Sequence, residues 1–236
     1  MQGPSARPAG SVWQGWGSYD VYESADCVPW KWEPGPTQLR RQAVAARSAD
    51  LLATAILIDT ETTGVGDDSE VIEIAILDSN GSTLLNTLVR PTQPIPAEAT
   101  SLHRITDAMV ANAPTWPEIA LQYEAIIAGR TVVAYNAQFD QRVISQTYQR
   151  YGMDAPELTT ACAMLLYASW NGEWVEGQLG WQWRWIKLGE AARECGVLVE
   201  GAHRALADTQ MTLGVLRYLQ KRSNGRKPGR PNGRGK

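Results

Sequence analysis

The chain has 236 residues, 44% of them hydrophobic, which is enough to bury a large core, usually as one main domain with extensions. Its formal net charge of -3 is unevenly distributed, because seven of the 22 basic residues lie in the acid-free segment 221–236 and the other 15 stand against 25 acids. Three irregularly spaced cysteines (Cys27, Cys162, Cys195) argue against a disulfide framework or a zinc site. No apolar run is long enough for a membrane span, and the polar start carries no signal region, so we expect a cytoplasmic protein without a membrane partner.

The first 50 residues do not follow the pattern of a regular core layer. They hold four tryptophans between glycines, prolines and acids (Trp13, Trp16, Trp30, Trp32). Such aromatic side chains either anchor an arm to the main domain or contact a partner or DNA. We therefore predict a tryptophan-containing N-terminal extension over residues 1–50, with a short helix at 38–48 leading into the domain.

Regular structure begins with strands. The longest apolar run, 51–58, predicts a buried strand that includes the short β-branched and apolar run 54–58, and residues 71–77 predict a second strand. Asn80-Gly81 is typical of a hairpin turn, after which residues 83–89 form the returning strand. Tight turns between successive strands indicate an antiparallel start.

Helices and a further strand alternate in the rest of the chain. Residues 115–128 form an amphipathic helical pattern, which Thr115 and Glu118 would cap and Gly129 would end. A strand is expected at 131–135, and helices are expected at 138–151, 161–169, 186–195 and 205–222. A meander followed by alternating helices and strands predicts an α/β sandwich around a mixed sheet.

Two segments stand apart from this order. Five tryptophans among glycines occupy residues 170–185 (Trp170, Trp174, Trp181, Trp183, Trp185). They either pack as a folded hairpin or form a stacking rim for single-stranded bases. Residues 223–236 are rich in Gly, Pro, Arg and Lys and predict a disordered basic tail. The main domain is therefore expected over residues 51–222, with the tryptophan-rich insert inside it.

Four acids stand where chemistry would need them. Asp59 and Glu61 follow the first strand and point the same way, because strand side chains alternate faces, so their charges repel unless a cation lies between them. Asp140 comes just past the 131–135 strand, and Asp208 enters the last helix. Each alone is an ordinary acid near a strand end or a helix start. Together the four carboxylates suit two hard divalent ions.

His203 lies five residues before Asp208. Within one α-helix this spacing would separate the two side chains by about 140° around the axis. His203 can therefore work with Asp208 only if it precedes the helix on a loop. A lone histidine there is ordinarily a surface or capping residue, but beside four carboxylates a neutral imidazole is a candidate general base for a metal-bound water.

Three sequence blocks now combine into a resemblance. DTETTG (59–64), NAQFD (136–140) and HRALAD (203–208) resemble, in this order, the blocks of the histidine subtype of the DEDD exonuclease superfamily. These are the DnaQ-like proofreading 3′–5′ exonucleases related to the bacterial polymerase III epsilon subunit. The match covers about residues 53–218 and includes LHRITD (102–107), which resembles the family's H-G-I-T segment with Arg104 in place of glycine. Arg204 stands where the tyrosine subtype would have its tyrosine.

The resemblance implies a ribonuclease H-like three-layer sandwich with a central mixed five-stranded sheet. It also implies a metal-dependent 3′–5′ exonuclease that hydrolyses phosphodiester bonds from the 3′ end of single-stranded DNA and releases nucleoside 5′-monophosphates. Two Mg²⁺ or Mn²⁺ ions would be held by the four acids, with His203 as the general base (catalytic and metal residues: Asp59, Glu61, Asp140, Asp208).

The resemblance further assigns a set of substrate-binding residues. Thr60, Thr62 and Val65 would line the terminal nucleotide, with His103 and Phe139 beside its sugar or base. Asn136 would position the phosphate. For Phe139, the only phenylalanine in the chain, a plain core position remains open.

Two other functions remain open at this point. The catalytic blocks do not distinguish DNA from RNA, so an exoribonuclease is the near alternative. A non-cutting nucleic-acid-binding or scaffold module associated with a polymerase is the other, although such a module would have no use for all four acids and His203. A polymerase or another protein partner would dock through the N-terminal arm or the basic tail.

Overall fold

The computed structural model describes residues 37–177, 180–198 and 200–222. The predicted arm up to residue 36 and the predicted basic tail 223–236 lie outside these residues, and the domain limits at 51 and 222 stay predictions. Among the described residues, no helix is both long and apolar enough to cross a membrane.

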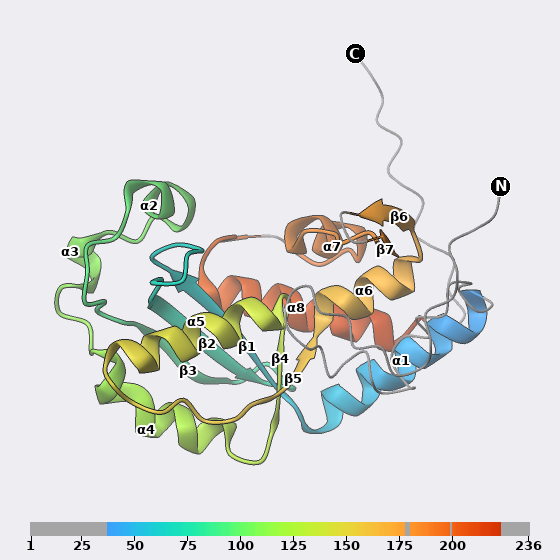
Figure 1. The fold of residues 1–236 in the computed structure, drawn as a ribbon. Helices are drawn as coiled ribbons and strands as arrows, with labels where there is room; N and C mark the ends of the chain where they lie inside the picture. The colour runs from blue at the N-terminus through green and yellow to red at the C-terminus, as the bar shows by residue number, and fades with distance from the viewer. Residues whose placement is uncertain (1–36, 178–179, 199, 223–236) are drawn as a thin grey trace.

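The predicted mixed five-stranded sheet is confirmed, with the strand order β3-β2-β1-β4-β5 (Figure 1). β1 pairs antiparallel with β2 and parallel with β4, while β2–β3 is antiparallel and β4–β5 parallel. In chain order the elements are α1 (Thr37–Thr54), β1 (Ile56–Thr62), β2 (Val71–Asp78), β3 (Thr83–Leu88), α2 (Ala97–His103), α3 (Asp107–Val110), α4 (Trp116–Ile127), β4 (Thr131–Ala134), α5 (Ala137–Arg150), β5 (Thr159–Cys162), α6 (Ala163–Asn171), β6 (Trp174–Gly177), β7 (Gly180–Trp183), α7 (Leu188–Glu194) and α8 (Ala205–Gln220).

The two faces of β1 are covered by different helices. Side chains alternate along a strand, so Thr60 points to one face, while Asp59 and Glu61 point to the other. Thr60 bonds to Asp140 on α5, and the two acids face Asp208 on α8. α5 and α8 therefore lie on opposite faces of the sheet, and Figure 1 shows α5 passing in front of the strands.

α1 belongs to the same core as the sheet. It packs on α8 and α6, and its residues Val44 and Leu51 are buried. The buried Arg40 donates through Nε to the carbonyl oxygen of Ser169 at 2.8 Å. Gly172 ends α6 with φ 73, and a Cβ there would lie 2.2 Å from the Arg40 guanidinium, so only glycine fits.

Three predicted elements differ from the structure. The helix predicted at 38–48 continues to Thr54, so residues 51–54 are helical and the strand starts at Ile56. The helix predicted at 161–169 begins at Ala163, because Thr159–Cys162 pair with β4 as β5. Strand β5 carries two threonines and no apolar run, so its parallel pairing, rather than its pattern, makes it a strand. The short helices α2 and α3 were not predicted.

The tryptophan-rich insert forms the β6–β7 hairpin. The Trp174 and Trp183 rings meet edge to face with centroids 4.5 Å apart, and the Arg40 guanidinium lies 4.7 Å from the Trp183 centroid. Trp170 is buried beside Tyr218. These contacts favour the packing interpretation for three of the five tryptophans. Trp185 is 38% exposed, and the side chain of Trp181 lies outside the description.

Candidate active site

Three carboxylates converge at the edge where β1 meets the start of α8. Asp59 and Glu61 come from β1, and Asp208 comes from the first turn of α8. One oxygen atom of each lies within 4.8 Å of the others. Glu61 is buried, and the other two are partly buried. A set of three hard oxygen donors at this spacing fits a divalent cation such as Mg²⁺ or Mn²⁺.

The electrostatics of this acid cluster (Asp59, Glu61, Asp208) point the same way. Burial raises the pKa of Glu61 to about 8, and the neighbouring carboxylates add to the shift. Burial and then the charge of Asp140 raise the pKa of Asp59 well above its usual range, and burial raises the pKa of Asp208. Neither Asp59 nor Glu61 accepts a hydrogen bond from another described residue. The ionised cluster therefore needs a positive partner, which a bound cation supplies.

Asp140 lies beside this cluster but is not one of its three converging members. It is buried in the first turn of α5. Its Oδ1 accepts hydrogen bonds from the Thr60 N–H at 3.1 Å and the Thr60 hydroxyl at 2.8 Å. Burial raises its pKa to about 7, although the Thr60 bonds oppose the shift. Thr60 therefore fixes one oxygen of Asp140 and leaves the other for a ligand.

His203 precedes α8, as its spacing from Asp208 requires. It is exposed, adopts the left-handed region with φ 64, and donates its backbone N–H to Asp208 Oδ1 at 3.2 Å. The imidazole is thus carried by a short loop that is tied to one member of the acid cluster.

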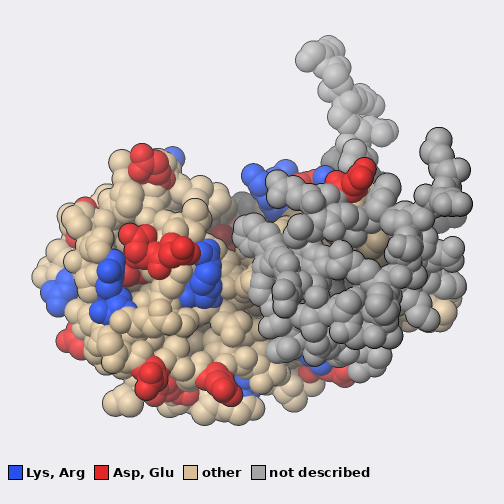
Figure 2. All heavy atoms as spheres, in the orientation of Figure 1, with Lys and Arg blue, Asp and Glu red and all other residues tan. Residues whose placement is uncertain are grey.

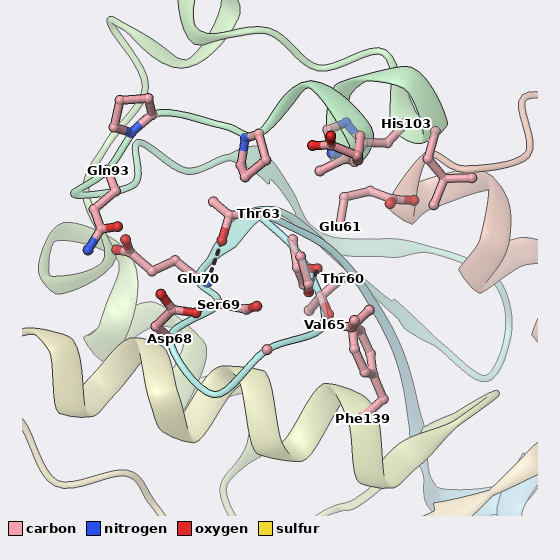
Figure 3. A pocket seen from close by; sticks show the side chains of 18 residues that line it. Thr60, Glu61, Thr63, Val65, Asp68, Ser69, Glu70, Gln93, His103 and Phe139 are labelled. Atoms are coloured by element: carbon pink, nitrogen blue, oxygen red, sulfur yellow. Dashed lines mark hydrogen bonds between the residues drawn. The ribbon is translucent and has the colours of Figure 1, made fainter.

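A cavity of about 540 Å³ opens next to Glu61 (Figure 3). It is lined by five of the six residues predicted to bind substrate, namely Thr60, Thr62, Val65, His103 and Phe139. The sixth, Asn136, is the exposed N-cap of α5 and does not line it. Phe139 also packs against the main core, in line with its predicted core position, and its place beside a nucleotide stays a prediction. Val65 is 77% exposed and forms an apolar rim.

His103 presents a fixed polar edge in this cavity. It is buried, and its Nδ1 accepts the N–H of Ile105 at 3.0 Å. Burial lowers its pKa, although an interaction with the Thr62 backbone opposes the shift. Because Nδ1 accepts a hydrogen bond, the neutral ring carries its proton on Nε2. Figure 3 places His103 above Glu61. A donor is therefore held at the wall of the cavity.

Sequence reasoning missed the wall contributed by α2 and the segment before it. Pro96, Glu98, Ala99 and Leu102 all line the cavity. The signal was present, because a proline followed by Ala-Glu-Ala is typical of a helix start. Arg104 ends α2 in the left-handed region with φ 64, the conformation that glycine adopts most readily.

Two ion pairs hold the loop that forms one side of the cavity. Arg142 contacts Asp67 at 3.6 Å, and Arg150 contacts the buried Glu70 at 3.7 Å. Figure 2 shows acidic side chains between groups of basic ones on the face in view. The loop between β1 and β2 is therefore held from α5, which fixes one side of the cavity.

A cluster of acids that can hold a cation, beside a cavity of about 540 Å³ on a five-stranded α/β sheet, matches the class of ribonuclease H-like nucleases. The family model RNase_T, described as "Exonuclease", matches residues 56–216. This is more than half of the chain, which therefore belongs to that exonuclease family. The resemblance to DEDD, DnaQ-like exonucleases is thus confirmed.

Curated proteins agree with this assignment. The uncharacterized exonuclease CP81 of Escherichia phage 186 is 50% identical over 173 residues, which are 70% of this chain and 88% of that protein. A DNA polymerase III subunit epsilon-like protein of Rhodobacter capsulatus is 35% identical over 189 residues, 75% of this chain but 25% of the relative. Exodeoxyribonuclease 10 of Escherichia coli K12 is 37% identical over 91 residues, 38% of this chain and 40% of that enzyme.

Solved structures share the fold. Exonuclease X in complex with 5′ overhanging duplex DNA superposes with a TM-score of 0.53 and 28% identity, covering 73% of this chain and 95% of that one. The zinc-bound complex of Escherichia coli exonuclease I with single-stranded DNA gives a TM-score of 0.59 at 16% identity, covering 72% and 41%. The second likeness concerns the fold alone, and it confirms the ribonuclease H-like α/β class.

Proposed function

We propose that the protein is a divalent-metal-dependent 3′–5′ exonuclease that releases nucleoside 5′-monophosphates from single-stranded DNA ends. The observation that carries this proposal is the convergence of Asp59, Glu61 and Asp208 within 4.8 Å beside a nucleotide-sized cavity. The names of the exodeoxyribonuclease relative and of the exonuclease X–DNA complex support DNA as the substrate.

Each residue of the site has a role in this proposal. Asp59, Glu61, Asp208 and Asp140 would hold two Mg²⁺ or Mn²⁺ ions, which would supply charge neutralisation at the phosphate and a more acidic water. His203 takes the proton of the attacking water on a ring nitrogen, and its loop position allows it to approach from outside the cluster.

The cavity holds the terminal nucleotide. Val65 and Phe139 offer apolar contact to the base, and the neutral His103 offers its Nε2–H to the sugar or base. Thr60 and Thr62 line the floor, and Asn136, outside the cavity, contacts the phosphate. The strand end is thereby oriented with its last phosphodiester at the carboxylates.

The rest of the chain is assigned more simply. We propose an exonuclease domain over residues 51–222, extended by the arm 1–50, whose last part packs on the domain core as α1, and by the basic tail 223–236. The epsilon-like relative supports a polymerase or another protein as the partner of these extensions.

A single assay tests the activity, the direction and the sugar together. Matched DNA and RNA oligonucleotides, labelled at either end, are incubated with the protein and Mn²⁺, with and without EDTA. We expect a ladder from 5′-labelled DNA, early release of mononucleotide from 3′-labelled DNA, and no product with EDTA. Faster trimming of RNA would show that RNA, rather than DNA, is the preferred substrate. No product from either polymer would reject the proposed exonuclease activity.

A further inference from the structure

Besides Asp140, another buried carboxylate stands next to the acid cluster without belonging to it. Glu73 on β2 is 4% exposed and lies directly opposite Glu61 in the β1–β2 pairing. Like charges at facing positions of two strands destabilise a sheet. Glu73 must therefore receive compensation from elsewhere.

That compensation comes from the start of α8. The Nε–H of Arg204 donates to both oxygens of the Glu73 carboxylate, at 3.1 Å from Oε1 and 3.0 Å from Oε2, and Nη2 also donates to Oε1. The backbone N–H of Ala205, the first residue of α8, donates to Oε2 at 2.9 Å. Arg204 is the N-cap residue of α8, but its side chain does not cap the helix. Glu73 caps α8 from a neighbouring strand instead, where an anion is favoured.

Arg204 and Ala205 lie between the two residues of this segment that the proposed mechanism uses. His203 comes immediately before Arg204, and Asp208 comes one turn after it. His203 holds an unfavourable left-handed φ of 64 and bonds to Asp208. Such a conformation persists in a non-glycine residue only where its surroundings hold it. The bonds from Arg204 and Ala205 to Glu73 therefore connect the start of α8 to strand β2.

We propose that Glu73, bonded to Arg204, is a positioning residue for the reaction. It holds the start of α8 in place, and with it the distance of His203 and Asp208 from the acids on β1. This inference rests on the proposed function. It gives a specific task to a buried acid that offers no ligand atom to the cluster, because its oxygens accept hydrogen bonds from Arg204 and Ala205.

Two substitutions of opposite charge separate positioning from simple electrostatics. Glu73→Gln removes a negative charge near the cations, and Arg204→Gln removes a positive one. If only charge mattered, the first would weaken Mn²⁺ binding and the second would strengthen it. If position matters, both lower kcat by about 10- to 100-fold, the range found for residues that orient metal ligands. The losses in the double variant should then not add, because both substitutions break one unit.

The measurements are kcat and KM on a 5′-labelled DNA strand, Mn²⁺ affinity from the free-ion electron paramagnetic resonance signal, and the melting temperature. Glu118→Gln is the matched control, because Glu118 caps α4 by accepting the Thr115 N–H and α4 contributes nothing to the site. This control should lower the melting temperature and leave kcat and Mn²⁺ affinity within about twofold of wild type.

The outcomes are distinct. A loss of kcat in both variants, with KM within about threefold, supports positioning. Opposite shifts in Mn²⁺ affinity with a normal kcat for Arg204→Gln overturn it, and so does a Glu73→Gln variant that behaves like the control. A wild-type protein that binds Mn²⁺ but cuts neither DNA nor RNA would reject the proposed function instead. In that case weaker Mn²⁺ binding by both variants would still support the placement of Asp208.

Discussion

Glu61 and Glu70 are both nearly inaccessible to solvent, at 8% and 1% exposure, and they border the same cavity. Glu70 accepts hydrogen bonds from the N–H and the hydroxyl of Thr92, and Arg150 lies 3.7 Å away. Glu61 accepts none from any described residue and faces two other carboxylates. A buried acid with its full set of donors ties segments of the fold together. A group of acids that meet with few donors repel one another until protons or an added cation neutralise them.

The largest effect on hydrolysis is expected for a substitution of Asp59, the acid surrounded by the other carboxylates. Asp59→Asn keeps the shape of the side chain but removes the central charge of the acid cluster. Hydrolysis should fall by at least about three orders of magnitude, because ion-mediated stabilisation of the phosphate is lost. The metal-free melting temperature should not fall, since like-charge repulsion is relieved. Trimming of a labelled oligonucleotide at the wild-type rate would contradict the assignment of Asp59.

His203→Ala tests the only proposed catalytic side chain outside the carboxylates. Loss of a general base should slow turnover by about 10²- to 10⁴-fold. Mn²⁺ affinity should remain unchanged, because the bond to Asp208 comes from the His203 backbone rather than from the ring. An equal loss of Mn²⁺ affinity and turnover would make the imidazole a ligand instead.

The raised pKa values at the site predict how the stability of the metal-free protein depends on pH. The pKa values of Glu61 and Asp140 are raised by burial to about 8 and about 7, against ordinary values of 4.5 and 3.8. Between about pH 4 and pH 8 the folded metal-free protein therefore holds protons that the unfolded chain has released. By linkage, these groups make the free energy of unfolding decrease as pH rises through this window.

Saturating Mn²⁺ should remove this decrease, because the cation replaces the protons. Thermal melts from pH 5 to pH 8, with EDTA or with Mn²⁺, measure the effect. Glu61→Gln is the control and should show a shallower decline in EDTA. The same decline in both proteins would show that Glu61 is not the source.

The smallest effect is expected for the paired acid. Glu70→Gln weakens the bonds from Thr92 and the contact with Arg150, so the free energy of unfolding should fall by about 1–3 kcal/mol. Mn²⁺ affinity should be that of wild type, because Glu70 does not belong to the acid cluster. Chemical denaturation and Mn²⁺ titration test the two statements separately. Weaker Mn²⁺ binding by this variant would contradict the purely structural role assigned to Glu70.

Sequence reasoning succeeded where the signal is local. Alternation along β1 puts Asp59 and Glu61 on one face, and the five-residue spacing puts His203 ahead of α8. The pairing of Thr115 with Glu118 marks the start of α4, and the structure contains that cap. These features depend on neighbours within a few residues.

Sequence reasoning failed where contacts between distant segments determine the local structure. Residues 159–162 become a strand only because β4 lies beside them, and the α2 wall of the cavity was missed. Nothing near Glu73 in the chain indicates that it caps a helix 132 residues later.

The amino-acid order by itself determined which acids this protein carries, on which strand face or helix start each sits, and that they belong to an exonuclease pattern. Only the tertiary structure decided which acids meet without donors and which are paired, because hydrogen-bond partners and burial arise from contacts between segments far apart in the chain. The same acidic side chain therefore pairs with donors at Glu70 and Glu73 and meets other acids at Glu61, where the proposed function has it bind a cation.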